Sequence, residues 1–245
     1  MPAVQLLTKR RRVLVIKPRF SQAELKLAAV VGMTLNHTAG ILLANGTIRE
    51  IMLLAGGISM PLFARFISDG FEYTRDRGKY AFRLGVSAVI SHFAFSFAFG
   101  TPYLISSAIF TLLLAFFALC VIHMESVPKS IRGLMLFYIL ICSLIGDWGW
   151  CAVLWAILFD LLKNRPESQF LMITAFVLIG VAYVIFMFGL TGTIAIRNFG
   201  FLLAIPLLLA YSGKQGRQPR ALRSCLYLYY PAHLFVLGII KDVIV

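Results

Sequence analysis

The chain has 245 residues, of which 60% are hydrophobic and 13% are charged. A soluble domain of this length carries roughly twice that charged fraction, so the composition excludes an ordinary globular enzyme. The formal net charge of +13 would suit a nucleic-acid-binding protein, but the basic cluster Lys9–Arg12 lacks the interleaved aromatic residues that stack on bases. We therefore predict an integral membrane protein with no nucleic-acid partner, and binding by Lys9–Arg12 stays only a distant alternative.

Apolar runs of membrane length follow one another along the chain. They lie at about 25–44, 51–68, 81–100, 104–123, 131–146, 148–162, 170–190, 194–211 and 224–243. The two runs within 131–162 are short and meet at Gly146–Gly149, so they form either two spans or one re-entrant hairpin. The pattern predicts an all-α fold, a polytopic transmembrane bundle of about nine helices. A basic arm of residues 1–24 precedes this single domain, which covers residues 25–245.

The positions of lysine and arginine predict the orientation of the bundle. Basic residues are concentrated on the N-terminal arm and on the even-numbered connections between the apolar runs, whereas the odd-numbered connections contain Arg49 and little else. No small-residue cleavage site follows the first apolar run, so we expect no cleavable signal peptide. The alternation predicts a cytoplasmic N-terminus and an external C-terminus.

The four cysteines are expected to be free thiols. Cys120, Cys142, Cys151 and Cys225 all lie in apolar runs and show no CxxC spacing. Such a pattern favours neither a disulfide nor a zinc site. We predict no metal.

Histidines at membrane depth are the first functional candidates, because an ionisable side chain in hydrocarbon is costly unless it is paired or hydrated. His37, His92 and His233 lie near the middle of the first, third and last apolar runs. His37 and His233 lie at similar distances from the cytoplasmic ends of their helices, so they can meet at one level of the bundle. A lone imidazole that only bonds a neighbouring helix is the structural alternative.

Lys26 and His37 are eleven residues apart, which is about three helical turns, so their side chains lie on one face of a helix. Lys26 is expected at the cytoplasmic rim and His37 about 16 Å deeper. A molecule with anionic phosphates and a long arm, such as acyl-CoA, fits this spacing, and imidazole suits proton transfer from an attacking amine or hydroxyl. The alternative for Lys26 is a simple interfacial anchor.

Four segments of the sequence resemble the TraX family of membrane acetylases, which are associated with conjugative pilin. They are the Lys26–His37 helix KLAAVVGMTLNH, the segment Leu54–Leu84, the turn Asp147-Trp148-Gly149, and the run Tyr229–Leu234 with Tyr-Pro-Ala-His-Leu in the last helix. They occur in the family's order and are spread over most of the chain. The spacing of a basic residue ten positions before a histidine is also similar to that of other acyl-CoA-dependent membrane acyltransferases.

The resemblance implies an acyltransferase of the bacterial inner (cytoplasmic) membrane that uses acetyl-CoA as acyl donor. The implied acceptor is the N-terminal amine of a pilin, and a hydroxyl or a small amine stays open. On this basis His37 is expected to act as general base or transient acyl carrier, and His233 to assist it. Asn36 would orient His37, and Asp147 would line the outer mouth of the site.

Lys26, together with Arg65 and Arg83, is expected to hold the phosphates of acetyl-CoA. For Arg65 a second reading is open, because an arginine near the interface also snorkels or pairs with a carboxylate.

The sequence departs from the family's pattern at Asn36, where Asp is usual, at Gly57, where Arg is usual, and at His92, where Glu is more typical. Asn36 and Gly57 would fit an ion pair that has been lost as a unit, which leaves no orphan charge. The same departures fit a non-catalytic protein that keeps the fold. A small transporter or flippase is the remaining alternative, although the two halves show no inverted repeat.

Overall fold

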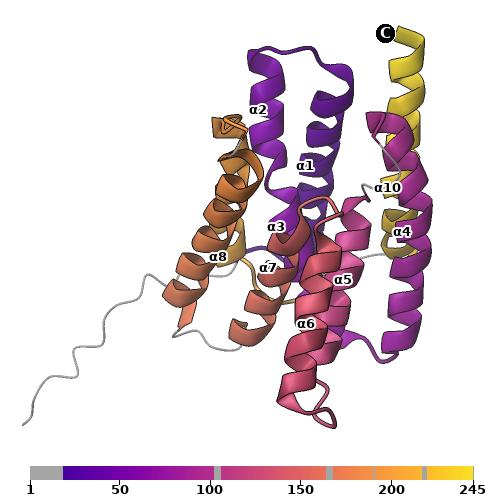
Figure 1. Ribbon diagram of the computed structural model, residues 1–245. Coiled ribbons are helices and arrows are strands. Elements are labelled where there is room, and N and C mark those ends of the chain that lie inside the picture. Colours follow the sequence, from indigo (N-terminus) through magenta and orange to yellow (C-terminus); the bar gives the residue numbers. More distant parts are fainter. Residues whose placement is uncertain (1–18, 102–105, 164–167, 190, 217–219, 245) are drawn as a thin grey trace, which may run out of the picture.

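The computed structural model describes residues 19–101, 106–163, 168–189, 191–216 and 220–244. Helices dominate these ranges (Figure 1). They are α1 (Gln22–Leu42), α2 (Thr47–Gly56), α3 (Ser59–Tyr73), α4 (Arg77–Phe99), α5 (Ala108–Ile122), α6 (Lys129–Ser143), α7 (Gly149–Leu162), α8 (Gln169–Val184), the π-helix η2 (Ile185–Gly189), the 3-10 helix η3 (Ile196–Ala204), α9 (Ile205–Leu209) and α10 (Arg220–Ile244). Each predicted apolar run coincides with one helix or with two consecutive helical segments, so the predicted all-α bundle is confirmed.

Four helical stretches are long and apolar enough to cross a membrane within the described ranges, namely Gln22–Leu42, Thr47–Tyr73, Arg77–Phe99 and Gln169–Gly189. Shorter apolar helices cover Ala108–Ile122, Gly149–Leu162 and Ile196–Leu209. The chain is therefore a membrane protein. Residues 1–18 of the basic arm, Arg217 and the side chains of 220–227, which include Cys225, lie outside the described parts, and the cytoplasmic placement of the N-terminus stays a prediction.

The segment 131–162 forms a hairpin of two short helices. α6 has 15 residues and α7 has 14, which makes each about 22 Å long, less than the roughly 30 Å of a bilayer core. The turn between them lies part-way along the bundle, short of the ends that α1, α2 and α4 reach (Figure 1). Each helix is therefore shorter than a full-length span, and the choice between two spans and one re-entrant hairpin stays a prediction.

Local hydrogen bonds fix where two of the site-bearing helices, α1 and α4, begin. Ser21 and Glu24 form a reciprocal capping box at the start of α1, and the Asp76 carboxylate accepts from the backbone N–H of Lys79 at the start of α4. Such caps satisfy donors that the first turn of a helix leaves open. They set the register of the helices that carry His37 and Arg83.

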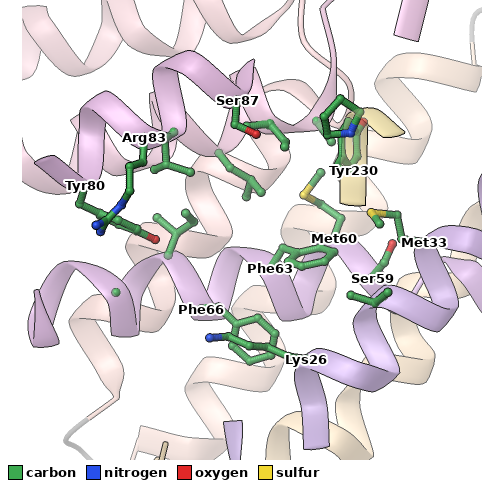
Figure 2. Close-up of a pocket in the computed structure, with 18 of the residues that line it drawn as sticks. Lys26, Met33, Ser59, Met60, Phe63, Phe66, Tyr80, Arg83, Ser87 and Tyr230 are labelled. Carbon is green, nitrogen blue, oxygen red and sulfur yellow. The ribbon is translucent and has the colours of Figure 1, made fainter. Parts of the chain in front are cut away.

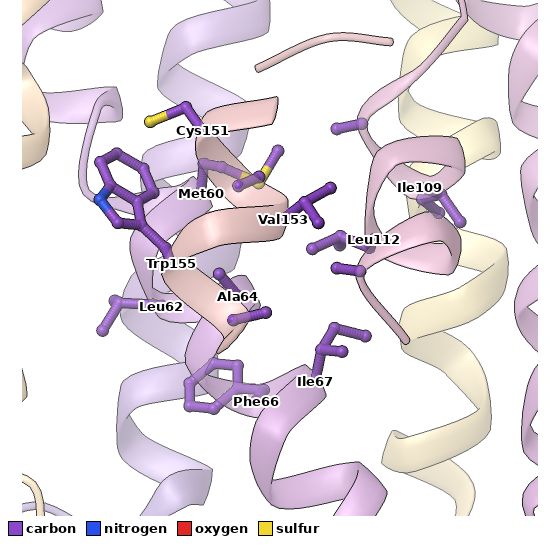
Figure 3. Packing of buried hydrophobic residues seen from close by; sticks show 14 of the residues in the cluster. Met60, Leu62, Ala64, Phe66, Ile67, Ile109, Leu112, Cys151, Val153 and Trp155 are labelled. Carbon is purple, nitrogen blue, oxygen red and sulfur yellow. The ribbon is translucent and has the colours of Figure 1, made fainter. Parts of the chain in front are cut away.

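Part of the hydrophobic core lies between α3, α5 and α7 (Figure 3). Trp155 of α7 is fully buried, and its indole N–H donates to the backbone carbonyl of Phe176 in α8. Leu62 and Ala64 on α3 are also fully buried. Because interiors of this kind are closely packed, α3 is held firmly, and its other face forms part of the site.

A glycine contact joins the break between α2 and α3 to η3. A side-chain carbon built on Gly57 would lie 2.6 Å from the Cα of Gly200, so the two backbones touch. The side-chain direction of residue 57 faces η3, whereas Asn36 packs against Gly56. The hypothesis of a lost ion pair between positions 36 and 57 therefore finds no support in the geometry.

Candidate functional site

The two histidines predicted to meet are in direct contact. His37 Nδ1 of α1 lies 2.7 Å from His233 Nε2 of α10, and both side chains are buried. Their rings are nearly parallel, with centroids 5.0 Å apart. The first and last helices of the chain therefore bring together two titratable side chains that are 196 residues apart in sequence.

The neighbouring hydrogen bonds show which histidine donates and which accepts in the His37–His233 hydrogen bond. His233 Nδ1 lies 2.9 Å from the carbonyl oxygen of Tyr229, which only accepts, so this nitrogen carries a proton. In a neutral imidazole the other nitrogen is then an acceptor, and His233 Nε2 accepts from His37 Nδ1–H. His37 Nε2 keeps its lone pair, which makes His37 the base of the pair and His233 its support.

Two residues that the sequence reasoning did not single out hold His233 in place. The Tyr229 ring stacks on His233 at 5.0 Å and 11°, and the Tyr229 hydroxyl lies 2.8 Å from Thr34 Oγ1 on α1. Thr34 also donates to the carbonyl of Val30, 2.8 Å away, so its oxygen is the acceptor for Tyr229. The spacing gives the missing signal: Thr34 and Tyr229 precede the two histidines by about one helical turn.

His37 lines a cavity of about 810 Å³. It lies at the end of the cavity that is about 16 Å along α1 from Lys26, which we call the inner end. The walls of the cavity come mainly from α1, α3 and α4, and Tyr230 of α10 closes the inner end (Figure 2). Lys26, Met33, Phe63 and Ser87 also line the cavity. The volume lies towards the upper end of the range for pockets that bind small molecules.

Lys26 and Arg83, two of the three predicted phosphate contacts, both line the cavity (Figure 2). Each cation lies near an aromatic ring: Lys26 Nζ is 5.8 Å from the centre of Phe66, and the Arg83 guanidinium carbon is 5.9 Å from the centre of Tyr80. Lys26 and His37 therefore share one cavity at two depths. The arrangement agrees with the predicted stripe on α1.

Arg65 is not among the residues that line the cavity. Its Nε lies 3.3 Å from the Asp69 carboxylate, one helical turn along α3, and its guanidinium lies over the ring of Tyr211. Tyr211 also donates to Asp69, at 2.5 Å. The structure thus follows the pairing alternative for Arg65, and we leave it out of the proposed phosphate contacts.

Asp147 also lines the cavity, in a turn with unusual backbone geometry. Trp148 has a φ of +62° and Gly149 a φ of +41°. A positive φ is rare for a bulky residue and needs support from the surroundings. Support comes from the stacking of Trp148 on Tyr183 and from hydrogen bonds that join the backbone of Asp147 to Ser106 and Thr111.

The remaining predicted residues separate into two groups. Asn36 lines the cavity beside His37. His92 is absent from the cavity lining and contacts the ring of Phe93 on the same helix. The structure brings together Lys26, Asn36, His37, Arg83 and Asp147 around one cavity, with His233 directly behind His37.

Comparison with known proteins identifies the family to which the chain belongs. The family model described as TraX protein matches residues 21–241, which include every residue of the site. The chain belongs to the TraX family. It is also similar to the probable fimbrial assembly protein FimC, serogroup H1, of Dichelobacter nodosus, with 28% identity over 233 residues that cover 89% of this chain and 94% of that protein. No solved structure matches the chain.

The four segments that resemble the TraX family all contribute residues or helices to the cavity. Three of these segments, around His37, Asp147 and Tyr230, supply residues to the inner end of the cavity, and the fourth supplies α3 and the first part of α4, which contain Phe66 and Arg83. Segments far apart in the chain therefore converge on one site.

Proposed function

We propose that this TraX-family protein is a membrane acyltransferase that transfers an acetyl group from acetyl-CoA to an amine. The observation that carries the proposal is the His37–His233 pair. His37, whose Nε2 is the basic nitrogen of the pair, lines a cavity that is also lined by the cations Lys26 and Arg83. A base that is paired and buried but in contact with a ligand-sized cavity has the properties of a catalytic group.

The reaction needs two proton transfers, one from the acceptor amine to His37 and one to the thiolate of CoA. The acceptor nitrogen attacks the thioester carbonyl while His37 Nε2 takes a proton from that nitrogen, so a C–N bond forms as the C–S bond breaks. The leaving thiolate of CoA then receives the proton. His233 accepts the hydrogen bond from His37 Nδ1–H and stabilises the positive charge that develops on the imidazole.

The side chains around the cavity fit this donor. Lys26 and Arg83 are suited to the phosphates of CoA, since charged donors bind phosphate strongly. The stretch between these cations and His37 is lined by apolar side chains, including Val30, Met33 and Phe63, which suits the uncharged arm that carries the acyl thioester. Asn36 and Asp147 also line the cavity, and we propose that they orient the acceptor amine.

For the acceptor, the FimC name and the TraX family favour a pilus protein. We propose the N-terminal amine of a pilin subunit, with the protein in the bacterial inner membrane. A hydroxyl acceptor would use the same base and the same proton route.

The direct test is transfer of labelled acetyl from acetyl-CoA by the purified protein in liposomes. His37→Ala should lower the rate at least about a hundredfold, the usual range for loss of a general base. His92→Ala is the matched control because it removes an imidazole that does not line the cavity, and it should keep the wild-type rate.

An unchanged rate in His37→Ala would overturn the proposed role of this residue. Absence of both acetyl transfer and CoA binding would favour the non-catalytic alternative. Ion-coupled flux without acetyl-CoA would favour a transporter. Trapping of an acetyl group on His37 during turnover would replace direct transfer by a two-step route.

A further inference from the structure

The cavity meets the outside of the bundle in two chemically different ways. One part of its exposed lining is polar and consists of Tyr73, Arg83 and Gln215, and we call it the polar mouth. Four further exposed lining residues are apolar: on α4 Phe82 is 72% exposed, Val86 43% and Ile90 49%, and on α10 Leu228 is 66% exposed. We call the set Phe82, Val86, Ile90 and Leu228 the side opening.

Resting on the proposed function, we propose that the acceptor is an apolar peptide segment with a free N-terminal amine, which reaches His37 from within the bilayer through the side opening. Two substrates must meet at His37. If the charged donor fills the polar mouth, the second substrate needs a different route, and the side opening is the other exposed part of the lining that the described residues provide.

The shape of the side opening suits a peptide helix. Phe82, Val86 and Ile90 are spaced four residues apart along α4, which makes a ridge of the kind that packs into the groove of a neighbouring helix. Gly85 lies next to this ridge, and a side-chain carbon built on it would have no neighbour within 4 Å. A small residue in such a place lets another helix approach closely in a membrane.

The depth of His37 favours a peptide over a lipid amine. His37 lies about 16 Å beyond Lys26 along α1. The amine of a phospholipid headgroup is attached to a phosphate, which would have to follow it to that depth at a high cost in hydration. An N-terminal amine is followed by an uncharged peptide backbone with apolar side chains, so no second charged group enters the cavity.

The experiment compares two acceptors in liposomes of phosphatidylcholine: a synthetic apolar peptide of single-span length with a free N-terminal amine, and a short water-soluble peptide. Val86→Trp and Ile90→Trp narrow the side opening. They should lower transfer to the apolar peptide at least fivefold relative to transfer to the soluble peptide. Leu178→Trp on α8, where Leu178 is 63% exposed and outside the cavity lining, is the matched control and should change neither rate.

Equal effects on both acceptors, or no effect, would overturn the proposal, and so would faster transfer to phosphatidylethanolamine than to the apolar peptide. A second measurement does not depend on catalysis. The apolar peptide carrying a photoreactive group near its N-terminus should crosslink to residues 82–90 and not to α8. Crosslinks at α4 without acetyl transfer would contradict the proposed function alone. Acetyl transfer without crosslinks at α4 would contradict only the proposed entry of the acceptor through the side opening.

Discussion

Tyr229 and Thr34 decide how firmly the histidine pair is aligned. The Tyr229 carbonyl holds the proton on His233 Nδ1, the ring of Tyr229 stacks on His233, and the hydroxyl is anchored to Thr34 on α1. One residue of α10 therefore sets the tautomer and the tilt of His233. Through His233 it sets the free lone pair of His37.

Removing the Thr34–Tyr229 hydrogen bond should weaken catalysis without weakening donor binding. Tyr229→Phe and Thr34→Val each remove one side of a bond worth about 1 kcal/mol, so kcat should fall about fivefold while KM for acetyl-CoA stays unchanged. Because both variants break the same contact, the double variant should be no slower than either single one.

Tyr138→Phe provides the matched control, because Tyr138 is exposed on α6 and outside the cavity lining. A parallel rise in KM, or additive losses in the double variant, would show that Tyr229 and Thr34 act on something other than the alignment of the pair.

At the residue scale the sequence predicted the side chains that line the cavity better than the side chains that hold them in place. The spacing of Lys26 and His37 is a property of one helix, so periodicity is enough to place both on one stripe. The contact between Thr34 and Tyr229 joins the first helix to the last one, and no local pattern encodes it. For Arg65, in contrast, a local pattern is sufficient. Its partner Asp69 lies at the i+4 position, which favours an ion pair within one helix.

Among the elements, the joint between α2, α3 and η3 depends on two glycines. The backbones of Gly57 and Gly200 are in contact, and a side-chain carbon on Gly200 would overlap the carbonyl oxygen of Leu54. Backbone atoms on both sides leave little room for adjustment. The joint matters to the site because α3 is one wall of the cavity.

Gly200→Ala should therefore destabilise the protein by about 1–3 kcal/mol, the usual cost of overpacking. Thermal unfolding in detergent measures the change. Gly133→Ala on α6 is the control, since a carbon added there has no neighbour within 4 Å, and it should leave the protein as stable or slightly more stable. Equal behaviour of the two variants would contradict the proposed packing role of Gly200.

Helix boundaries were predictable to within a few residues because the apolar runs and their polar connections mark them. The division of the second apolar run at Gly57 was not predicted. It depends on a contact with η3, which comes more than a hundred residues later in the chain. The short α6–α7 hairpin was left open for the same reason, since run length alone does not say how deep a turn lies.

Over the whole molecule, the cavity is walled by helices from both ends of the chain. α1, α3 and α4 form its sides and α10 closes its inner end. A ligand that contacts several of these helices binds the folded arrangement and not the unfolded chain, so it should raise the unfolding temperature.

CoA at a hundred times its Kd should stabilise the protein by about 2.7 kcal/mol, a shift of several degrees. Lys26→Met should abolish most of this shift. Lys79→Met is the matched control, because the Lys79 side chain is 81% exposed and pairs with Asp76 away from the cavity. The same shift in Lys26→Met as in the wild type would place the phosphates of CoA elsewhere.

The distance in sequence between the two imidazoles also has a consequence for biosynthesis. Since 196 residues separate them, the ribosome delivers the first histidine to the membrane long before its partner has been translated. A nascent chain thus holds most of its helices but lacks the His37–His233 contact. On the proposed function, acetyl transfer at the full rate can begin only when the final helix has been inserted, so a prematurely terminated product should transfer acetyl more slowly however well the rest of it has assembled.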